Sequence, residues 1–430
     1  MGDPQPFSLP HTITQEWVRE FERVLLDLSR QPPRSLTGAV SSDLLLSILT
    51  QAECTLRAEP TLLEVDPQGA SVTVVGDTHG QFHDVCHIFK VAGYPSPTSL
   101  FIFNGDFVDR GSWGLETLLL LLAWKLAAPQ HVHLLRGNHE TALCTMVYGF
   151  KGELVAKLGR GKWKEVYGGC KRVFSVLPLA ARVAKTTLIL HGGLFRKPNP
   201  PNRARQKRRK INALELGSLE DLRAAHKGGM DPNGTGAARL ATDVLWSDPL
   251  LDPGFQFNTT RNIGMVFGPD VTQRFLEENG LRLILRSHEG PDAREGREDL
   301  SPMTEGHTLD HDTPAGRLMT VFSAPDYPQF VPESHARYNN KAALAVLTAP
   351  DYAAPTFLQF EAVRPRPMAH PYYDLGVPDS DEELEPLASD ASGMTDVEQD
   401  TSTTSEASVS VALPAGRGGE EVASVGADAP

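Results

Sequence analysis

The spacing of apolar residues divides the chain into a helical first part and a mixed second part. In the stretch ITQEWVREFERVLLDLS, apolar residues recur every three to four positions, which is typical of amphipathic helices, and similar spacing continues over residues 13–58. From residue 59 onward, short apolar runs rich in β-branched residues alternate with helical stretches. The short runs predict strands at 72–75, 100–104, 131–135, 186–190, 281–285, 317–322 and 342–348.

Helical spacing occupies most of the intervals between these predicted strands, at 82–91, 115–126, 140–158 and 270–279. Strands that alternate with helices are typical of an α/β core, and the closer spacing of the last strands suggests antiparallel additions to it. The run LLLLLAW at 118–124 is shorter than the roughly 20 apolar residues that span a bilayer. It therefore predicts a buried helix, and we expect no membrane association.

Changes in composition mark the regions of the chain. We expect a loose N-terminus at 1–12, a helical extension at 13–58 packed on the main domain, and a main domain at 59–365. Inside that domain, residues 196–238 form a long basic connection in which no strand is predicted, and such loops are usually functional or disordered. Residues 366–430 are acidic and rich in Ser, Thr, Ala and Gly, which predicts a disordered tail.

The net charge of −13 is concentrated in this tail, because the residues from Asp379 onward include thirteen acidic residues and one basic residue. The rest of the chain is nearly neutral, which argues against nucleic acid as a partner. The four cysteines show no C-x-x-C spacing, and the N-terminus lacks the apolar run of a signal peptide. We therefore expect reduced thiols in a nuclear or cytoplasmic protein.

Side chains suited to metal binding or acid–base chemistry follow several of the predicted strands. Asp77 and His79 come after the first strand, and Asp106 ends the second. Asn138 and His139 follow the third. Two later strands end at His191 and His288. Because strand carboxyl ends gather on one face of an α/β sheet, we expect these groups to converge.

This set contains carboxylates, imidazoles and an amide oxygen but no thiolate, which favours Mn, Fe or Zn in a mixed nitrogen and oxygen site. There are too many ligands for one tetrahedral ion, whereas two ions bridged by a carboxylate would use them all. Two such ions can hold a hydroxide that attacks a phosphoryl group. Arg110 and Arg261 are candidate phosphate clamps, since a guanidinium pairs bidentately with phosphate oxygens.

Seven short motifs carry a family resemblance. In order between residues 76 and 327 they are GDTHGQ, GDFVDRG, LRGNHE, LHGGL, LWSDP, LRSHE and SAPDY. Together they resemble the catalytic domain of the PPP-type metal-dependent serine/threonine protein phosphatases. The resemblance implies the calcineurin-like metallophosphoesterase fold, a central β-sandwich flanked by helices with a two-metal site at its edge.

The resemblance also implies a role for each matching residue. One metal ion would be held by Asp77, His79 and Asp106. The other would be held by Asp106 as the bridge, Asn138, His191 and His288. The substrate phosphate would be bound by Arg110, Arg261, Asn138 and Tyr327. His139, oriented by Asp109, would protonate the leaving oxygen while a metal-activated hydroxide attacks phosphoserine or phosphothreonine in line.

Three features resemble the plant type-seven branch of this family. They are the long basic connection, the stretch SAPDYPQF and the late stretch VRPRPMAHPYYDLG. That branch is associated with calmodulin and with the nucleus. The basic cluster at 207–210 fits a solvated loop, a nuclear import signal or a calmodulin target, and a partial apolar face at 211–219 keeps calmodulin binding at 196–219 open.

Two other functions are compatible with parts of this pattern. The first is a different phosphoesterase on the same metal scaffold, such as a dinucleoside polyphosphate hydrolase, but the later motifs WSDP and SAPDY argue against it. The second is a catalytically weak binding or scaffold protein, and the complete ligand set with both arginines argues against that.

Overall fold

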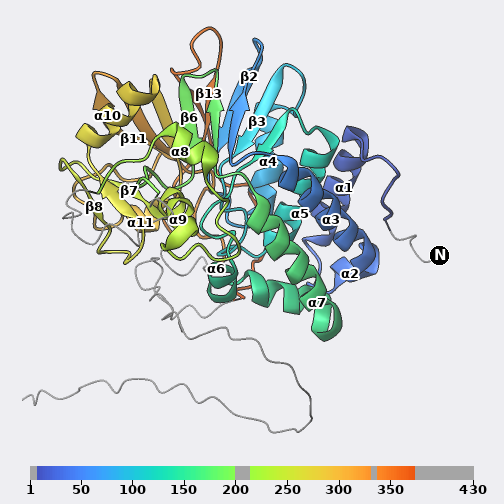
Figure 1. The fold of residues 1–430 in the computed structure, drawn as a ribbon. Coiled ribbons are helices and arrows are strands. Elements are labelled where there is room, and N and C mark those ends of the chain that lie inside the picture. Colours follow the sequence, from blue (N-terminus) through green and yellow to red (C-terminus); the bar gives the residue numbers. More distant parts are fainter. Residues whose placement is uncertain (1–6, 199–213, 331–336, 373–430) are drawn as a thin grey trace, which may run out of the picture. The chain divides into compact units, whose positions relative to one another are not determined.

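The computed structural model describes residues 7–198, 214–330 and 337–372 (Figure 1). The N-terminal extension is helical, as its periodicity predicts, with α1 (Gln15–Leu28), α2 (Ser35–Ala39) and α3 (Ser42–Ala58). Thr14 and Ser41 cap the first and third helices, since each side-chain oxygen accepts a hydrogen bond from a backbone N–H of the first turn. The buried faces of these helices join the same apolar cluster as α5 and α7.

Within the described residues, the strands of the main domain form two large sheets. The five-stranded sheet has the order β14-β13-β2-β3-β4. Its strands are β2 (Ser71–Val75), β3 (Ser99–Phe103), β4 (Val132–Leu134), β13 (Ala342–Leu347) and β14 (Thr356–Phe360). Strands β2, β3 and β4 are parallel, whereas β13 runs antiparallel to β2 and to β14.

The six-stranded sheet has the order β1-β5-β6-β10-β12-β11. Its strands are β1 (Leu62–Val65), β5 (Ala180–Val183), β6 (Thr187–Leu190), β10 (Leu283–Arg286), β11 (His307–Thr313) and β12 (Gly316–Val321). Strands β6, β10 and β12 are parallel, and β11 pairs antiparallel with β12. The predicted antiparallel additions near the end of the chain are therefore present.

The two sheets pack face to face as a sandwich, because successive side chains of each strand point to opposite faces of its sheet and those on the inner faces are apolar. Val72 and Val74 of β2 share an apolar cluster with Ile189 of β6 and Leu285 of β10, between the sheets. The intervening residues of these strands point outward, as Val75 does towards the helices of the extension. The interior of the sandwich is thus built mainly from one face of each sheet, with Ala70, Leu135 and Tyr352 added from the adjoining loops.

Helices cover both outer faces of the sandwich (Figure 1). Together with the N-terminal helices, α4 (Phe82–Ala92), α5 (Gly114–Ala127) and α7 (Phe150–Val176) pack on the five-stranded sheet. On the six-stranded sheet lie α9 (Arg239–Trp246) and α10 (Pro269–Asn279). The predicted α/β fold, a central β-sandwich flanked by helices, is confirmed.

Several local predictions were wrong. The single helix expected at 140–158 is two helices, α6 (Ala142–Val147) and α7, because Gly149 adopts a left-handed conformation with φ 116° between them. Several strands were missed, including β1, β5, β11 and β14. The sequence of β11, HTLDHDT, contains a single apolar residue and therefore shows no apolar run. A small third sheet was also missed, formed by β7 (Asp248–Pro249), β8 (Phe255–Phe257) and β9 (Met265–Phe267). Strands β7, β8 and β9 have only two or three residues each, too few to show a periodic pattern.

The long connection at 196–238 is partly folded. Its described part contains α8 (Leu219–Ala224), which begins with a capping box between Ser218 and Asp221, and a short 3₁₀ helix, η2 (Gly236–Ala238). The basic cluster at 207–210 and most of the proposed calmodulin segment lie outside the described residues.

The boundary of the acidic tail was set too early. Residues 366–372 pack on the main domain, and the side chain of Arg366 is only 4% exposed. The rest of the expected tail, 373–430, lies outside the described residues.

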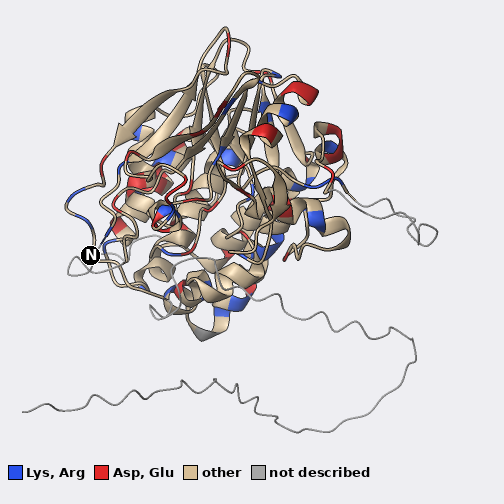
Figure 2. Cartoon of the chain, turned by 90° about the vertical axis from the view of Figure 1, so that its left-hand side faces the viewer, with Lys and Arg blue, Asp and Glu red and all other residues tan. Residues whose placement is uncertain are grey.

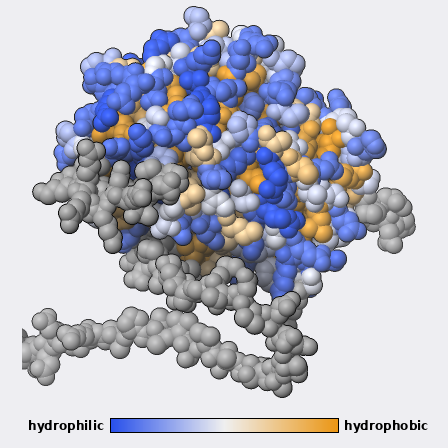
Figure 3. All heavy atoms as spheres, viewed as in Figure 1, coloured by the Kyte–Doolittle hydropathy of each residue, from blue (hydrophilic) through white to orange (hydrophobic). Residues whose placement is uncertain are grey.

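Acidic and basic side chains are interspersed over the described chain (Figure 2). The face in Figure 3 is largely hydrophilic, with small separate apolar patches. Among the described helices, none combines the length and apolar character needed to cross a membrane. Helix α5, which contains the predicted buried run, is enclosed over residues Gly114–Lys125.

Candidate active site

Loops that follow the parallel strands of both sheets meet at one edge of the sandwich. The backbone N–H of His288, after β10, donates to both carboxylate oxygens of Asp77, after β2, at 3.2 and 3.1 Å. The Nδ2 of Asn104, after β3, donates to the carbonyl of Leu190 in β6 at 2.8 Å. The site is therefore assembled across the two sheets, as convergence of strand ends predicted.

Gly105 and Gly137 let the loop after β3 and the loop after β4 approach each other closely through their backbones. A Cβ at Gly105, whose φ is +87°, would lie 2.3 Å from the nitrogen of Gly137. A Cβ at Gly137 would lie 2.1 Å from Oδ1 of Asp106. Only glycine fits such contacts, so the glycine of GDFVDRG and that of LRGNHE place Asp106 beside Asn138.

Among the described residues, two buried groups could each hold a metal ion, and Asp106 belongs to both. The first group is His79, Asp106 and His139, and the second is Asp106, His191 and His288. Oδ2 of Asp106 lies 3.7 Å from Nε2 of His79 and 3.3 Å from Nε2 of His191. A carboxylate shared by two groups has the position that a bridging ligand requires.

The remaining predicted ligands lie beside these groups. Oδ1 of Asn138 is 2.9 Å from Nε2 of His191 and 2.9 Å from Nδ1 of His288. Oδ1 of Asp77 is 3.8 Å from Nδ1 of His191. All six predicted metal ligands are buried. The structure thus brings the whole predicted set together.

The electrostatics of the cluster fit divalent cations. Burial and the neighbouring charge of Asp106 raise the pKa of Asp77 to about 7, because two carboxylates share a dry site. Burial opposes protonation of His191, yet the carboxylates of Asp106 and Asp77 raise its pKa to about 9. A buried site that attracts positive charge this strongly, with nitrogen and oxygen donors, suits two metal ions.

Burial, reinforced by the charge of His139, lowers the pKa of His79 to about 3. The imidazole is therefore neutral at physiological pH, which is the form that binds metals. Its Nδ1 lies 3.2 Å from the carbonyl oxygen of Val108. That contact orients Nε2 towards Asp106, as in many metal sites where a second contact fixes the ligand ring.

His139 and Asp109 form a buried acid–base pair. Nδ1 of His139 lies 2.8 Å from Oδ2 of Asp109, and the other oxygen of Asp109 accepts from the backbone N–H of Phe150 at 2.9 Å. Burial raises the pKa of Asp109, although the hydrogen bond from His139 opposes this shift. The backbone N–H of His139 donates to Asp106 Oδ1 at 3.0 Å. This pair is therefore fixed directly beside the predicted metal ligands.

A small cleft opens onto this cluster. Of the predicted site residues, it is lined by His79, Asp106, Arg110, His139, Arg261, His288 and Tyr327. The predicted residues Asp77, Asp109, Asn138 and His191 lie behind this lining. Gly290, Asp292, Ala293 and Phe322 line the cleft in addition, and they had not been predicted.

The two arginines of the cleft are held by residues to which no role was assigned from sequence. Nε of Arg261 lies 2.5 Å from Oδ2 of Asp248. The guanidinium of Arg110 lies over the ring of Tyr148 at 4.6 Å and 3.4 Å from Asp292. Asp248 was visible in the motif LWSDP, whereas neither Tyr148 nor Asp292 belongs to one of the seven motifs.

Backbone conformation is strained around the cleft. Positive φ angles occur at His79, Asp106, Asp109, Arg110 and His288, with values of 42°, 52°, 67°, 60° and 73°. Non-glycine residues rarely adopt this region, and its concentration at one place is typical of functional sites.

Comparison with known proteins agrees with this geometry. Residues 70–292 match the calcineurin-like phosphoesterases. Serine/threonine-protein phosphatase 7 of Arabidopsis thaliana is 44% identical over 405 residues, which cover 90% of this chain and 97% of the relative. Serine/threonine-protein phosphatase 5 of Homo sapiens is 39% identical over 325 residues, which cover 75% of this chain and 55% of the relative.

A solved structure shares the fold. A protein serine/threonine phosphatase from Saccharomyces cerevisiae, described as similar to human phosphatase PP5, aligns with a TM-score of 0.63 and 29% identity. The alignment covers 82% of this chain and 97% of that one.

Fold, buried ligand cluster and sequence matches together define a metal-dependent phosphoesterase, and the chain belongs to the calcineurin-like phosphoesterase family. Within it, the chain is a PPP-type serine/threonine phosphatase and hence a hydrolase. The likeness to the type-seven branch is confirmed as well. This fold implies a dimetal centre, and the two buried groups at the sandwich edge could hold its ions.

Proposed function

We propose that this protein hydrolyses phosphoserine and phosphothreonine in other proteins, using the cleft at the sandwich edge. The observation that carries the proposal is that an oriented His139–Asp109 pair and two arginines surround the cleft next to a buried set of metal ligands. An acid–base pair, anion clamps and metal ligands are the three components that phosphoester hydrolysis requires.

The proposed ligands divide between two ions that share Asp106. Asp77, His79 and Asp106 would hold one ion, and Asp106, Asn138, His191 and His288 would hold the other. When bound, such a pair of ions supplies an activated water and neutralises charge on the phosphoryl group. Mn, Fe and Zn are all compatible with these donors.

Arg110, Arg261, Asn138 and Tyr327 would bind the phosphate. The guanidinium of Arg261 is held by Asp248 and that of Arg110 stacks on Tyr148, so both are fixed before substrate arrives. Preorganised cations stabilise the charge that develops on the phosphoryl oxygens without further rearrangement.

His139 would donate a proton to the serine or threonine oxygen as it leaves. With Nδ1 hydrogen-bonded to Asp109, the proton that is transferred belongs to Nε2, on the other side of the ring. Asp109 stabilises the protonated imidazole and fixes its orientation. A histidine oriented in this way is a common general acid near neutral pH.

The central test is phosphate release from a phosphothreonine peptide with added Mn²⁺, comparing wild type with Asp106→Asn. We expect release by wild type and a loss of at least about 100-fold in the variant. Cleavage of a dinucleoside polyphosphate in preference to the peptide would instead indicate a dinucleoside polyphosphate hydrolase. No release by folded, Mn²⁺-loaded wild type would favour a binding protein.

We also propose that the connection at 196–219 regulates activity, with calmodulin as the candidate partner. The support is compositional, since eight basic residues lie between Arg196 and Lys210 and a partial apolar face follows. The later part of the connection reaches the active-site loop, because the guanidinium of Arg136 donates to the carbonyls of Lys227 and Met230. Repeating the assay with Ca²⁺-calmodulin tests this. The nuclear or cytoplasmic location stays a prediction.

A further inference from the structure

The last described segment of the chain, residues 363–372, crosses back over the main domain, and we call it the C-terminal brace. The backbone N–H of Val363 donates to Oδ1 of Asp84 in α4 at 2.8 Å. Seven residues later, the carbonyl of His370 accepts from Oγ of Ser112 at 2.6 Å. The brace therefore touches α4, which directly follows the loop carrying Asp77 and His79, and the loop after β3, which carries Asp106.

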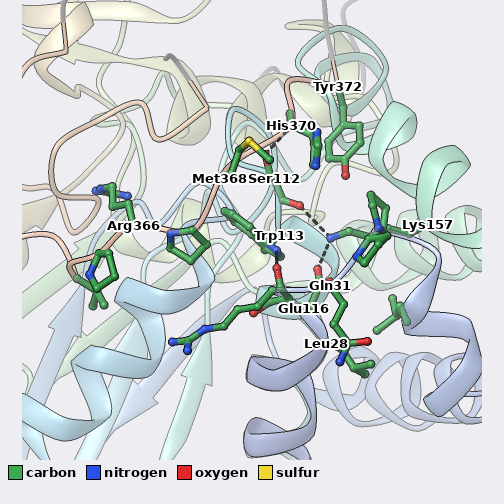
Figure 4. Close-up of a pocket in the computed structure, with 18 of the residues that line it drawn as sticks. Leu28, Gln31, Ser112, Trp113, Glu116, Lys157, Arg366, Met368, His370 and Tyr372 are labelled. Atoms are coloured by element: carbon green, nitrogen blue, oxygen red, sulfur yellow. Dashed lines mark hydrogen bonds and ion pairs between the residues drawn. The ribbon is translucent and has the colours of Figure 1, made fainter. Parts of the chain in front are cut away.

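Figure 4 shows the brace as one wall of a cavity whose other walls are the end of α1, the start of α5 and helix α7. Opposite His370, Lys157 donates to the carbonyl of Ser112 at 2.9 Å and pairs with Glu116 at 2.5 Å. These contacts fix the loop that follows Arg110, whose Ser112 in turn holds the brace through the carbonyl of His370.

Arg366 makes the central contact of the brace. Its side chain is 4% exposed. The guanidinium lies 3.3 Å from Oδ2 of Asp84 and 3.2 Å from Oδ2 of Asp326, and it donates to the carbonyl of Pro325. The guanidinium thus hydrogen-bonds the loop that carries Tyr327 through Pro325, and it lies within ion-pair distance of that loop at Asp326 and of α4 at Asp84.

Each partner of Arg366 adjoins a proposed site residue. Nε2 of Gln81, two positions after His79, donates to the carbonyl of Pro325 at 2.9 Å and to Oδ2 of Asp84 at 3.0 Å. Asp326 immediately precedes Tyr327 and has a strained φ of 46°. The rings of Tyr327 and His79 are 5.5 Å apart, so the Tyr327 loop and the His79 loop, which leads into α4, meet at the cleft.

We propose that Arg366 is a positioning residue for catalysis, which holds the Tyr327 loop against α4, the helix that follows the His79 loop, so that Tyr327 and His79 keep their places at the phosphate. This inference rests on the phosphate-binding role proposed for Tyr327. Lysine at this position keeps the charge, but its donors all lie on one nitrogen. Arg366 instead reaches Asp84, Asp326 and Pro325 from three separate nitrogens, Nη1, Nε and Nη2, which one ammonium group cannot span.

The test measures kcat and KM on a phosphothreonine peptide at saturating Mn²⁺ for Arg366→Lys, Tyr327→Phe and the double variant. We expect Arg366→Lys to lower kcat/KM by about 10- to 100-fold, since small displacements of binding groups cost that much. In the Tyr327→Phe background, the same substitution should cost little, because both changes affect one contact. Arg317→Lys, an exposed arginine paired with Asp312, is the matched control.

A kcat/KM for Arg366→Lys within twofold of wild type would overturn the proposal, whatever its melting temperature. The proposal would also be overturned if the double variant lost kcat/KM by the product of the two single losses, because independent effects indicate a general structural role for Arg366. If Arg366→Lys does not fold, Asp84→Asn removes one partner charge with little change in shape and takes its place.

Failure of this inference can be distinguished from failure of the proposed function. An unaffected Tyr327→Phe would remove the phosphate role of Tyr327 and this inference with it. Loss of activity in Asp106→Asn with full activity in Arg366→Lys would leave the proposed function standing and remove only the role of Arg366.

Discussion

The carboxylate of Glu140 accepts the backbone N–H of Asp106 at 2.8 Å, although the two residues follow different strands. The same carboxylate accepts from Phe107 and Gly137 at 2.8 and 2.9 Å. Burial and the charge of Asp106 raise the pKa of Glu140 to about 7. One buried side chain therefore fixes the two loops that supply the proposed bridging carboxylate, Asp106, and the proposed ligand amide, Asn138.

Glu140→Gln should weaken metal binding. The amide nitrogen of glutamine cannot accept a hydrogen bond, so at least one of the three backbone donors loses its partner. Changes to residues that orient metal ligands typically cost 10- to 100-fold in affinity, and we expect a loss of about that size in a Mn²⁺ titration. Glu277→Gln, on the exposed side of α10, should behave as wild type.

Asp109→Asn should lower kcat while leaving KM within a few-fold. Asparagine can present its amide to Nδ1 of His139, which favours the wrong tautomer and no longer stabilises the protonated ring. We expect a loss of about 10² to 10⁴ in kcat on a phosphothreonine peptide. Asp351→Asn, in a surface ion pair with Arg282, is the control. An equal loss in both variants would contradict a specific role for Asp109.

Mn²⁺ should stabilise the folded protein, because the ligand cluster exists only in the folded chain. At a concentration 100 times the dissociation constant, binding adds about 2.7 kcal/mol to the free energy of unfolding. Thermal unfolding with Mn²⁺ and with a chelator measures the difference. Asp106→Asn should lose most of this response, and a full response in that variant would argue against the shared ligand.

His83 should make stability fall in acid. Burial, with a smaller contribution from Arg30, lowers the pKa of His83 from 6.5 to about 3, and its Nε2 lies 2.9 Å from Oγ of Ser29. Between these two pH values the unfolded chain binds a proton that the folded chain does not, so the free energy of unfolding decreases as pH falls.

The expected contribution of His83 is up to about 1.4 kcal/mol for each pH unit below 6.5. Urea unfolding at pH 7 and pH 5 measures it. His83→Gln, which keeps a polar partner for Ser29, should show a smaller decrease between these two pH values than wild type. An unchanged difference would mean that the proton binds elsewhere.

The sequence was informative where the type and position of a residue together point to one role. Glycine, aspartate and histidine at the ends of apolar strands indicated the cluster around Asp106, and the strand-and-helix alternation indicated the sandwich. Both signals arise from local chemistry, which a sequence displays directly.

Residues that act through tertiary contacts could not be recognised in this way. Asp248 and Glu140 stand inside motifs, but nothing local shows that one holds Arg261 and the other three backbone donors. Arg366 was assigned to the acidic tail, because its burial depends on Asp84 and Asp326, which are distant in the sequence. The composition of a segment can be read from the segment itself, whereas the burial of a residue depends on the residues that pack against it.

The division of the proposed ligands between the two sheets has a consequence for the apolar interior of the sandwich. Asp77, Asp106 and Asn138 follow strands of one sheet, and His191 and His288 follow strands of the other. The thickness of the layer that includes Val74 and Ile189 therefore sets how far apart the two half-sites stand. If the proposed ligands bind metal ions, this layer acts as a spacer, and we expect the volume of its aliphatic side chains, far from any substrate, to affect the geometry of metal coordination.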